Sequence, residues 1–138
     1  MAEEHKLRAQ VLTPEGEVFD GEVEQLSTRT AVGDIGILAN HAPLVGRLVP
    51  AELRLHVSDS ETIRYAQAEG WLEVFANKAV VLIGEAIDPD DLDPSEIKQR
   101  LEDAEARLAD ADEDSAAAEQ AERDKARAEA FLEVAESR

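Results

Sequence analysis

Three histidines, His5, His41 and His56, are the side chains of this chain best suited to accept a proton near neutral pH. Asp34, His41 and Ser27 together offer the residue types of a hydrolase triad. The spacing contains no nucleophile elbow, and most chains of this length hold such a trio. We weigh the hydrolase hypothesis against two others, in which His41 either hydrogen-bonds backbone in a tight loop or contacts another protein.

A run of carboxylates at Asp88, Asp90, Asp91 and Asp93 has the composition of a cation site. An EF-hand loop needs glycine at its sixth position and glutamate at its twelfth. Counted from Asp88, these positions hold Asp93 and Gln99. We therefore expect a solvated acidic linker and no metal. The sequence also lacks a Gly-Lys-Ser/Thr phosphate loop and a Gly-x-Gly-x-x-Gly run, so no cofactor is expected.

The net charge limits the classes of partner. The 138 residues include 32 acidic and 14 basic ones, a formal charge of −18, which disfavours nucleic acid and anionic membrane surfaces.

Trp71 and Phe75 lie at strand spacing, and we expect them in the core rather than on a base-stacking platform. The absence of cysteine excludes disulfides and thiolate metal sites. The longest apolar run, residues 79–83, is far shorter than the ~18 residues that span a bilayer, so we expect a soluble intracellular protein.

The elements that must position these residues change in character near residue 87. Residues 1–86 hold all seven glycines and carry 7 − 14 = −7 charges, whereas residues 87–138 hold no glycine and carry 7 − 18 = −11. Short alternating runs between turn signals predict strands in the first part, at 7–11, 18–23, 53–57, 71–75 and 79–83 among others. We expect a β-sandwich or flattened barrel over residues 1–87, small enough to need a partner on one face.

The second part, residues 88–138, predicts a linker and an antiparallel α-helical hairpin. Asp93-Pro94-Ser95-Glu96 is a strong helix start, with Asp93 as N-cap. Two narrow apolar stripes follow, separated by a break at residues 110–115. They consist of Ile97, Leu101, Ala104, Leu108 and Ala111, then Ala118, Ala121, Ala128, Leu132 and Ala135. Small side chains bury little area, so we expect a weakly held hairpin that can detach.

Two segments carry a resemblance to a known family. Residues 33–44 read Gly-Asp-Ile-Gly-Ile-Leu-Ala-Asn-His-Ala-Pro-Leu, and residues 69–74 read Glu-Gly-Trp-Leu-Glu-Val. They resemble the G-E-L-G-I-x-x-x-H-A-P-L loop and the G-G-x-L-E-V strand of the epsilon subunits of F-type, proton-translocating ATP synthases. Glu69 stands in place of the first glycine of the second pattern. The order of sandwich and hairpin fits as well, so the resemblance covers nearly the whole chain.

The resemblance implies a non-catalytic subunit of the rotating central stalk, which couples proton flow through the membrane sector to ATP synthesis. The sandwich would bind the gamma subunit and rest on the ring of c subunits. The hairpin would fold against the sandwich or extend toward the alpha and beta catalytic subunits and inhibit ATP hydrolysis. Membrane association would arise only through the complex, peripheral on the cytoplasmic side of a bacterial cell membrane. The alternative is a free-standing β-sandwich binding module with a helical oligomerisation hairpin.

The resemblance also assigns candidate interface residues. At the interface with the ring and the gamma subunit it places residues of the first motif, namely Asp34, Ile35, Leu38, Asn40 and His41. At a contact with the catalytic beta subunit it places the three central cations of the last helix, Arg123, Lys125 and Arg127. Because residues 115–138 carry a net charge of 4 − 6 = −2, that contact is expected to be weak or salt-dependent.

Some members of this family bind ATP in the hairpin through an Ile/Leu-Asp-x-x-Arg-Ala pattern. Leu92 and Asp93 keep its first two positions, but Glu96 replaces the arginine and Ile97 replaces the alanine. An acidic side chain repels a phosphate where a cation should bind it. We therefore predict that the nucleotide site is lost and that ATP does not bind tightly.

Overall fold

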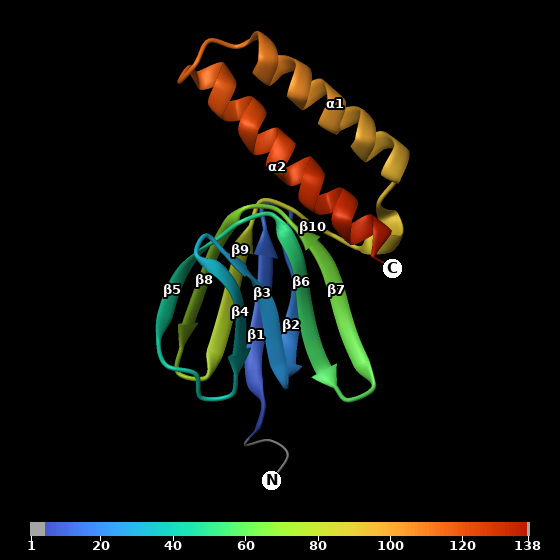
Figure 1. Ribbon diagram of the computed structural model, residues 1–138. Coiled ribbons are helices and arrows are strands. Elements are labelled where there is room, and N and C mark those ends of the chain that lie inside the picture. Colours follow the sequence, from blue (N-terminus) through green and yellow to red (C-terminus); the bar gives the residue numbers. More distant parts are fainter. Residues whose placement is uncertain (1–4, 138) are drawn as a thin grey trace.

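The computed structural model describes residues 5–137, which form ten strands followed by a 3₁₀ turn and two long helices (Figure 1). The predicted sandwich and hairpin are both present. The strands are β1 (Leu7–Thr13), β2 (Gly16–Val23), β3 (Gln25–Thr30), β4 (Gly33–Leu38), β5 (Leu44–Leu48), β6 (Ala51–Ser58), β7 (Glu61–Gln67), β8 (Gly70–Phe75), β9 (Lys78–Ile83) and β10 (Ala86–Ile87).

The strands curl into a nearly closed barrel flattened into two layers. Their order is β10-β7-β6-β3-β5-β8-β9-β1-β2, and β4 pairs with the second edge of β3. The pairing of β3 with β5 consists of the single match between Thr30 and Leu48, so this corner separates the two layers. The layer that contains β6 and β7 lies under the helices, whereas the layer of β5, β8, β9, β1 and β2 forms the other wall (Figure 1).

Alternating residues from both layers fill the core. Leu26, Leu53, Leu55, Leu72 and Val81 are fully buried within one contiguous cluster. Successive side chains of a strand point to opposite faces, so each strand contributes every second residue. This burial is the main force that holds the sandwich together.

The expectation that Trp71 and Phe75 lie in the core is wrong. Their exposed fractions are 54% and 65%, whereas Leu72 is fully buried and Val74 is 2% exposed. β8 alternates Trp71, Glu73 and Phe75 with Leu72 and Val74, and only one set can face the core because the side chains alternate with period two. The smaller aliphatic pair faces inward, so the aromatic pair lies on the outer surface.

The hairpin begins after a 3₁₀ turn at Pro89–Asp91 and contains α1 (Pro94–Asp110) and α2 (Ala116–Glu136). Asp93 caps α1, because its Oδ1 accepts a hydrogen bond from the Ser95 amide at 3.0 Å. Ser115 caps α2 by accepting from the Ala118 amide at 3.1 Å. The cap of α1 is thus the one that the sequence indicates.

The helices pack on each other and on one end of the sandwich (Figure 1). Ala66 and Ala68 of the sandwich lie in the same buried cluster as Ile97 of α1 and Phe131 and Val134 of α2. Ile87 of β10 packs against this cluster as well. That the hairpin is weakly held stays a prediction. Among the described residues, neither helix is long and apolar enough to cross a membrane.

Candidate interaction surfaces

Asp34 and Ile35 lie at the start of β4, at the end of the sandwich that faces α2. A tight turn precedes them, in which Thr30 Oγ1 donates to the Gly33 carbonyl at 2.9 Å and Gly33 adopts φ +136°. Asp34 accepts a hydrogen bond from Arg29 Nε at 2.8 Å and remains exposed. That hydrogen bond, with the charge of Asp34, raises the pKa of Arg29 above its ordinary value. Ile35 packs against the core.

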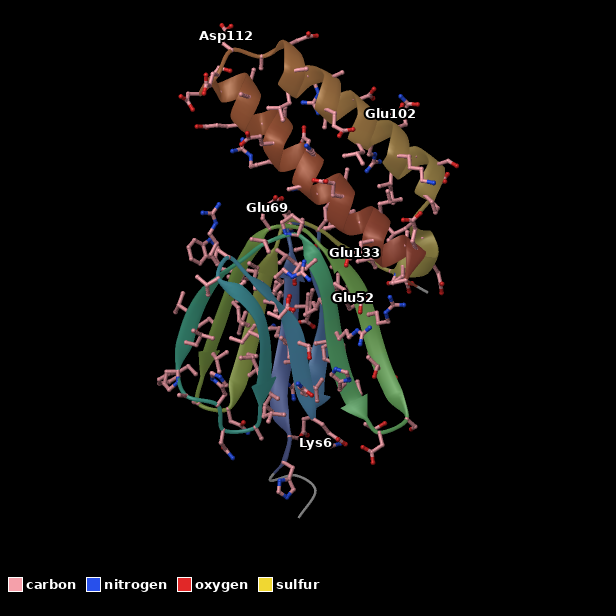
Figure 2. All side chains as sticks on the ribbon, viewed as in Figure 1. Lys6, Glu52, Glu69, Glu102, Asp112 and Glu133 are labelled. Atoms are coloured by element: carbon pink, nitrogen blue, oxygen red, sulfur yellow. The ribbon has the colours of Figure 1, made fainter. Side chains whose placement is uncertain are left out.

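Leu38, Asn40 and His41 lie at the opposite end of β4. The amide of Asn40 donates to Asn77 Oδ1 at 2.7 Å, and Asn77 Nδ2 donates to the Lys6 carbonyl at 2.9 Å. Lys6 lies at the end of the sandwich farthest from the hairpin (Figure 2). Since β4 separates this group from Asp34, the five candidate residues form two surfaces instead of one.

His41 hydrogen-bonds backbone in a tight loop, as one of the three hypotheses expects. Its Nδ1 lies 2.7 Å from the Ala42 carbonyl oxygen, and its amide donates to the Leu38 carbonyl at 3.2 Å. The hydrolase trio is not assembled, because the carboxylate of Asp34 pairs with Arg29 and the hydroxyl of Ser27 lies 3.5 Å from His56 Nε2. Among the described residues, no group of three or more acidic or histidine side chains could hold a metal ion.

An exposed apolar face covers the outside of β5, β8 and β9. We define the outer apolar face as Val45, Trp71, Phe75 and Leu82, whose exposed fractions lie between 46% and 69%. Strand register places Trp71 of β8 beside Leu82 of β9. It also places Val45 of β5 beside Glu73 of β8. Aromatic and aliphatic side chains clustered on a surface mark protein interaction sites. The polar opposite layer, where β3 and β6 present Gln25, Ser27 and Arg54, has no such character.

A cleft of about 290 Å³ lies between α1 and α2, with Glu85 of the sandwich at its edge, and is lined by both cations and carboxylates. Arg107 of α1 pairs with Asp124 of α2 at 2.8 Å. Arg127 Nη1 pairs with Glu85 of the sandwich at 2.8 Å, and its Nη2 pairs with Glu69. The arginines that a phosphate would need are therefore already engaged by carboxylates.

The residues of the ATP-binding pattern have structural roles in this chain. Leu92 packs against the hairpin cluster, and Asp93 uses its carboxylate to cap α1. Glu96 accepts a hydrogen bond from Arg100 Nη2 at 2.6 Å, one turn further along α1. The carboxylate of Glu96 thus engages Arg100, the first arginine of the helix.

The three cations of α2 do not share one surface. Arg127 faces the sandwich, where its side chain is 36% exposed. Arg123 is exposed and donates to Gln120 Oε1 at 2.8 Å, and Lys125 is half-buried. In the docked hairpin the proposed beta-subunit contact is therefore incomplete.

Comparison with known proteins identifies the family. The family model of the ATP synthase delta/epsilon chain, beta-sandwich domain, matches residues 6–89. The chain belongs to the ATP synthase delta/epsilon family. It is 42% identical over 127 residues to the ATP synthase epsilon chain of Persephonella marina, covering 91% of this chain and 93% of that one. It is 38% identical over 102 residues to the chloroplastic epsilon chain of Atropa belladonna, covering 74% and 76%.

Solved structures share the fold of this delta/epsilon family member. A chain in the cryo-EM structure of the Euglena gracilis mitochondrial ATP synthase superposes with a TM-score of 0.82 at 23% identity, covering 94% of this chain and 81% of that chain. A chain in the central stalk and c-ring structure from Tetrahymena thermophila gives a TM-score of 0.64 at 15% identity, covering 93% and 95%. Both matches include the sandwich together with most of the hairpin.

Two features of this family member have no counterpart among the sequence-based candidates. Asn77 bridges the His41 loop and the chain near Lys6, and nothing local to an Asn-Lys pair indicates that role. Glu69 and Glu85 engage Arg127. The one available signal was the departure from the family pattern at Glu69, which places a charged side chain where glycine is usual.

Proposed function

We propose that this chain is the epsilon subunit of an F-type ATP synthase and acts in the central stalk, coupling proton flow to ATP synthesis without catalysing it. The observation that carries the proposal is the 42% identity to an epsilon chain over nearly the full length of both sequences. Such a match includes the hairpin as well as the sandwich. Under this proposal the chain reaches the cytoplasmic face of the membrane only as part of the complex.

We assign the gamma subunit to the outer apolar face and to the neighbouring His41 loop. Trp71 and Phe75 supply large apolar area at that face, which suits the centre of a protein interface. The loop with Asn40 and His41 is joined to the turn after Phe75 through the Asn77 side chain, so the two surfaces are continuous. Leu38, 57% exposed, lies beside Gln25 on the polar layer and is not part of the outer apolar face.

We assign the ring of c subunits to the other group, Asp34 and Ile35. Asp34 is exposed at the end of the sandwich, where its carboxylate can meet basic loop residues of a partner. Charge pairing of this kind favours orientation over affinity. In this proposal residues 1–87 bind the stalk, and residues 88–138 form the regulatory domain, whose hairpin inhibits ATP hydrolysis when it extends.

Binding to the gamma subunit from the same source tests the central proposal. We expect the purified chain to bind immobilised gamma subunit, and Trp71→Ser with Phe75→Ser to abolish binding while circular dichroism stays unchanged. Arg54→Ser, on the exposed polar layer, is the control and should bind normally. A chain that self-associates but ignores gamma would instead favour the free-standing module with an oligomerisation hairpin.

Removal of the hairpin tests the regulatory part. We expect ATP hydrolysis by the assembled catalytic sector to be faster with residues 1–87 than with the full chain, because the inhibitory element is missing. Binding of both forms to gamma is measured in parallel, so that loss of assembly is distinguished from loss of inhibition. Equal hydrolysis rates at equal occupancy would remove the inhibitory role.

A further inference from the structure

Arg127 is placed where the hairpin meets the sandwich. Its ion pairs with Glu69 and Glu85 join the two parts, whereas the pairs Arg107–Asp124 and Arg100–Glu96 lie inside the hairpin. Glu69 lies at the end of the sandwich beneath α2 (Figure 2). Arg127 therefore ion-pairs with two carboxylates of the sandwich at once, and Arg64 of the sandwich adds a hydrogen bond to Ser137 Oγ at 3.2 Å.

Backbone pairing holds the two glutamates side by side. The Ala68 amide donates to the Glu85 carbonyl at 3.0 Å, and the Gly84 amide donates to the Glu69 carbonyl at 3.1 Å. The backbones of Glu69 and Glu85 are thus held next to each other within the sandwich. A planar guanidinium presents its N–H groups in a fork, so Arg127 can engage both carboxylates at once through Nη1 and Nη2.

The surroundings make this contact more important than an exposed ion pair. Burial opposes the charge of Arg127, but the hydrogen bond with Glu69 and the charges of both glutamates outweigh it, so its pKa is raised. The hairpin side of the chain carries −11 charges and the sandwich −7, so the two parts repel each other elsewhere. The apolar contact offers from the sandwich the small side chains of Ala66 and Ala68, with Ile87 of β10 packed against them.

We propose that Arg127, Glu69 and Glu85 form an electrostatic latch that holds the hairpin docked, and that an acidic protein surface opens the latch by competing for Arg127. The competition step rests on the proposed function, in which the hairpin extends toward the catalytic subunits. In the docked state Arg127 is occupied by the sandwich and withheld from any other acidic partner. In the extended state it joins Arg123 and Lys125 on a free helix.

Distance measurement on the full chain tests the latch without the complex. The chain has no cysteine, so Asp59→Cys in the β6–β7 loop and Glu113→Cys between the helices take spin labels specifically. Double electron–electron resonance then measures the distances between the two labels, and these give the fractions of chains with a released and a docked hairpin at about 0.15 M salt. We expect Arg127→Gln to raise the ratio of released to docked chains roughly tenfold, and Glu69→Gln with Glu85→Gln to do the same.

Arg107→Gln is the matched control, because Arg107 also pairs with a carboxylate but inside the hairpin. We expect it to leave the ratio within about twofold of the parent. Arg127→Gln changes the hairpin side of the contact, and the double glutamate variant changes the sandwich side. If circular dichroism shows that one of them misfolds, the other still tests the latch. If either variant folds and its ratio of released to docked chains equals that of the parent, the latch is overturned.

ATP hydrolysis by the assembled complex tests the competition. We expect Glu69→Gln with Glu85→Gln to strengthen inhibition, since the hairpin is released with its cation intact, and Arg127→Gln to weaken it. Release in the distance measurement with no change in hydrolysis by either variant would leave the latch standing and contradict the inhibitory function. Inhibition that changes equally for both variants would overturn the competition for Arg127.

Discussion

Glu52 shows how strongly one side chain can depend on its neighbours. It lies between Arg54 and Arg64, and Arg64 Nε donates to its Oε2 at 3.1 Å. Burial by itself raises the pKa of Glu52, but the hydrogen bonds from Arg64 and Arg54 outweigh it and hold the pKa below its ordinary value. Arg64 also donates to Ser137 Oγ at 3.2 Å, so this cluster supports the end of α2.

The lowered pKa of Glu52 predicts a pH dependence of stability. A depressed carboxyl pKa stabilises the fold above the ordinary value of 4.5, and this contribution is lost as the pH falls through the folded-state pKa. We expect Glu52→Gln to lower the free energy of unfolding by about 1 kcal/mol at pH 7. Urea unfolding between pH 7 and acid should show the difference shrinking below pH 4.5. A difference that stays constant with pH would contradict the assignment.

Asp34 gives a prediction about assembly instead of stability. We expect Asp34→Lys to weaken binding of the sandwich to the membrane sector, because the proposed ring contact loses its carboxylate. Exposed ion pairs contribute roughly 0 to 1 kcal/mol, so loss of the pair with Arg29 should barely change the Tm. Asp59→Lys, in an exposed loop at the other end, is the control. Normal proton-pumping coupling in membranes with Asp34→Lys would disprove the assignment.

At the scale of single elements, the approach of β8 to its neighbours leaves no room at Gly70. A Cβ built at this position would lie 1.9 Å from the Leu82 carbonyl oxygen, so any side chain forces β8 and β9 apart. The backbone of Gly70 pairs with Ile83 on one side and Leu48 on the other. This close approach gives a physical reason for glycine at the second position of the G-G-x-L-E-V pattern.

Alanine substitutions separate this packing effect from the general cost of losing a glycine. We expect Gly70→Ala to destabilise the chain by roughly 1 to 3 kcal/mol, because the strands must shift. Gly46→Ala, in the adjacent strand β5, meets only the Thr30 methyl group at 3.6 Å and should change stability little. Thermal unfolding of both variants measures the difference. Equal Tm values would show that the strands accommodate the methyl group at Gly70.

The start of α1 predicts the response to nucleotide. Because Glu96 pairs with Arg100 and Asp93 is used as a cap, we expect no ATP binding in the micromolar range. Titration with ATP, followed by amide shifts of residues 94–110, measures this directly. Glu96→Arg, which restores the cation of the family pattern, is the informative comparison. Micromolar binding by the parent chain would contradict the prediction.

Sequence predicted both helices and most strands because local rules specify them, but residues 33–44 were expected to form a loop, whereas the structure has β4 and the start of β5 there. Caps at Asp93 and Ser115 and alternation within the strands act over a few residues. The prediction from sequence failed at β8, although Glu73 lies between Trp71 and Phe75 on the same face and marks that face as the exposed one. It also missed the Arg127 contacts, since Glu69 and Arg127 are brought together only by tertiary packing.

At the scale of the whole molecule, the −18 charge is divided between two parts that must touch. Long-range repulsion between acidic surfaces is screened by salt, whereas a close and partly buried ion pair is screened less. Added salt should therefore favour the compact state of the full chain.

We expect the Tm to rise between about 0.1 M and about 1 M sodium chloride, as the Debye length falls from about 10 Å to about 3 Å. Differential scanning calorimetry measures the rise. Sucrose is the control, because it stabilises folded proteins without screening charge. A Tm that is flat or falls with salt would show that repulsion between the two parts is unimportant.

The pairing of β1 with β9 constrains the order in which the molecule can form. These strands run parallel, with Arg8 beside Lys78 and Leu12 beside Leu82, whereas β1 meets β2 through a short turn. Pairing of segments so distant in the chain closes a long loop and slows folding. During synthesis β1 must wait with one edge unpaired until residue 83 leaves the ribosome. The hairpin, made last, then docks on a sandwich that has only just closed.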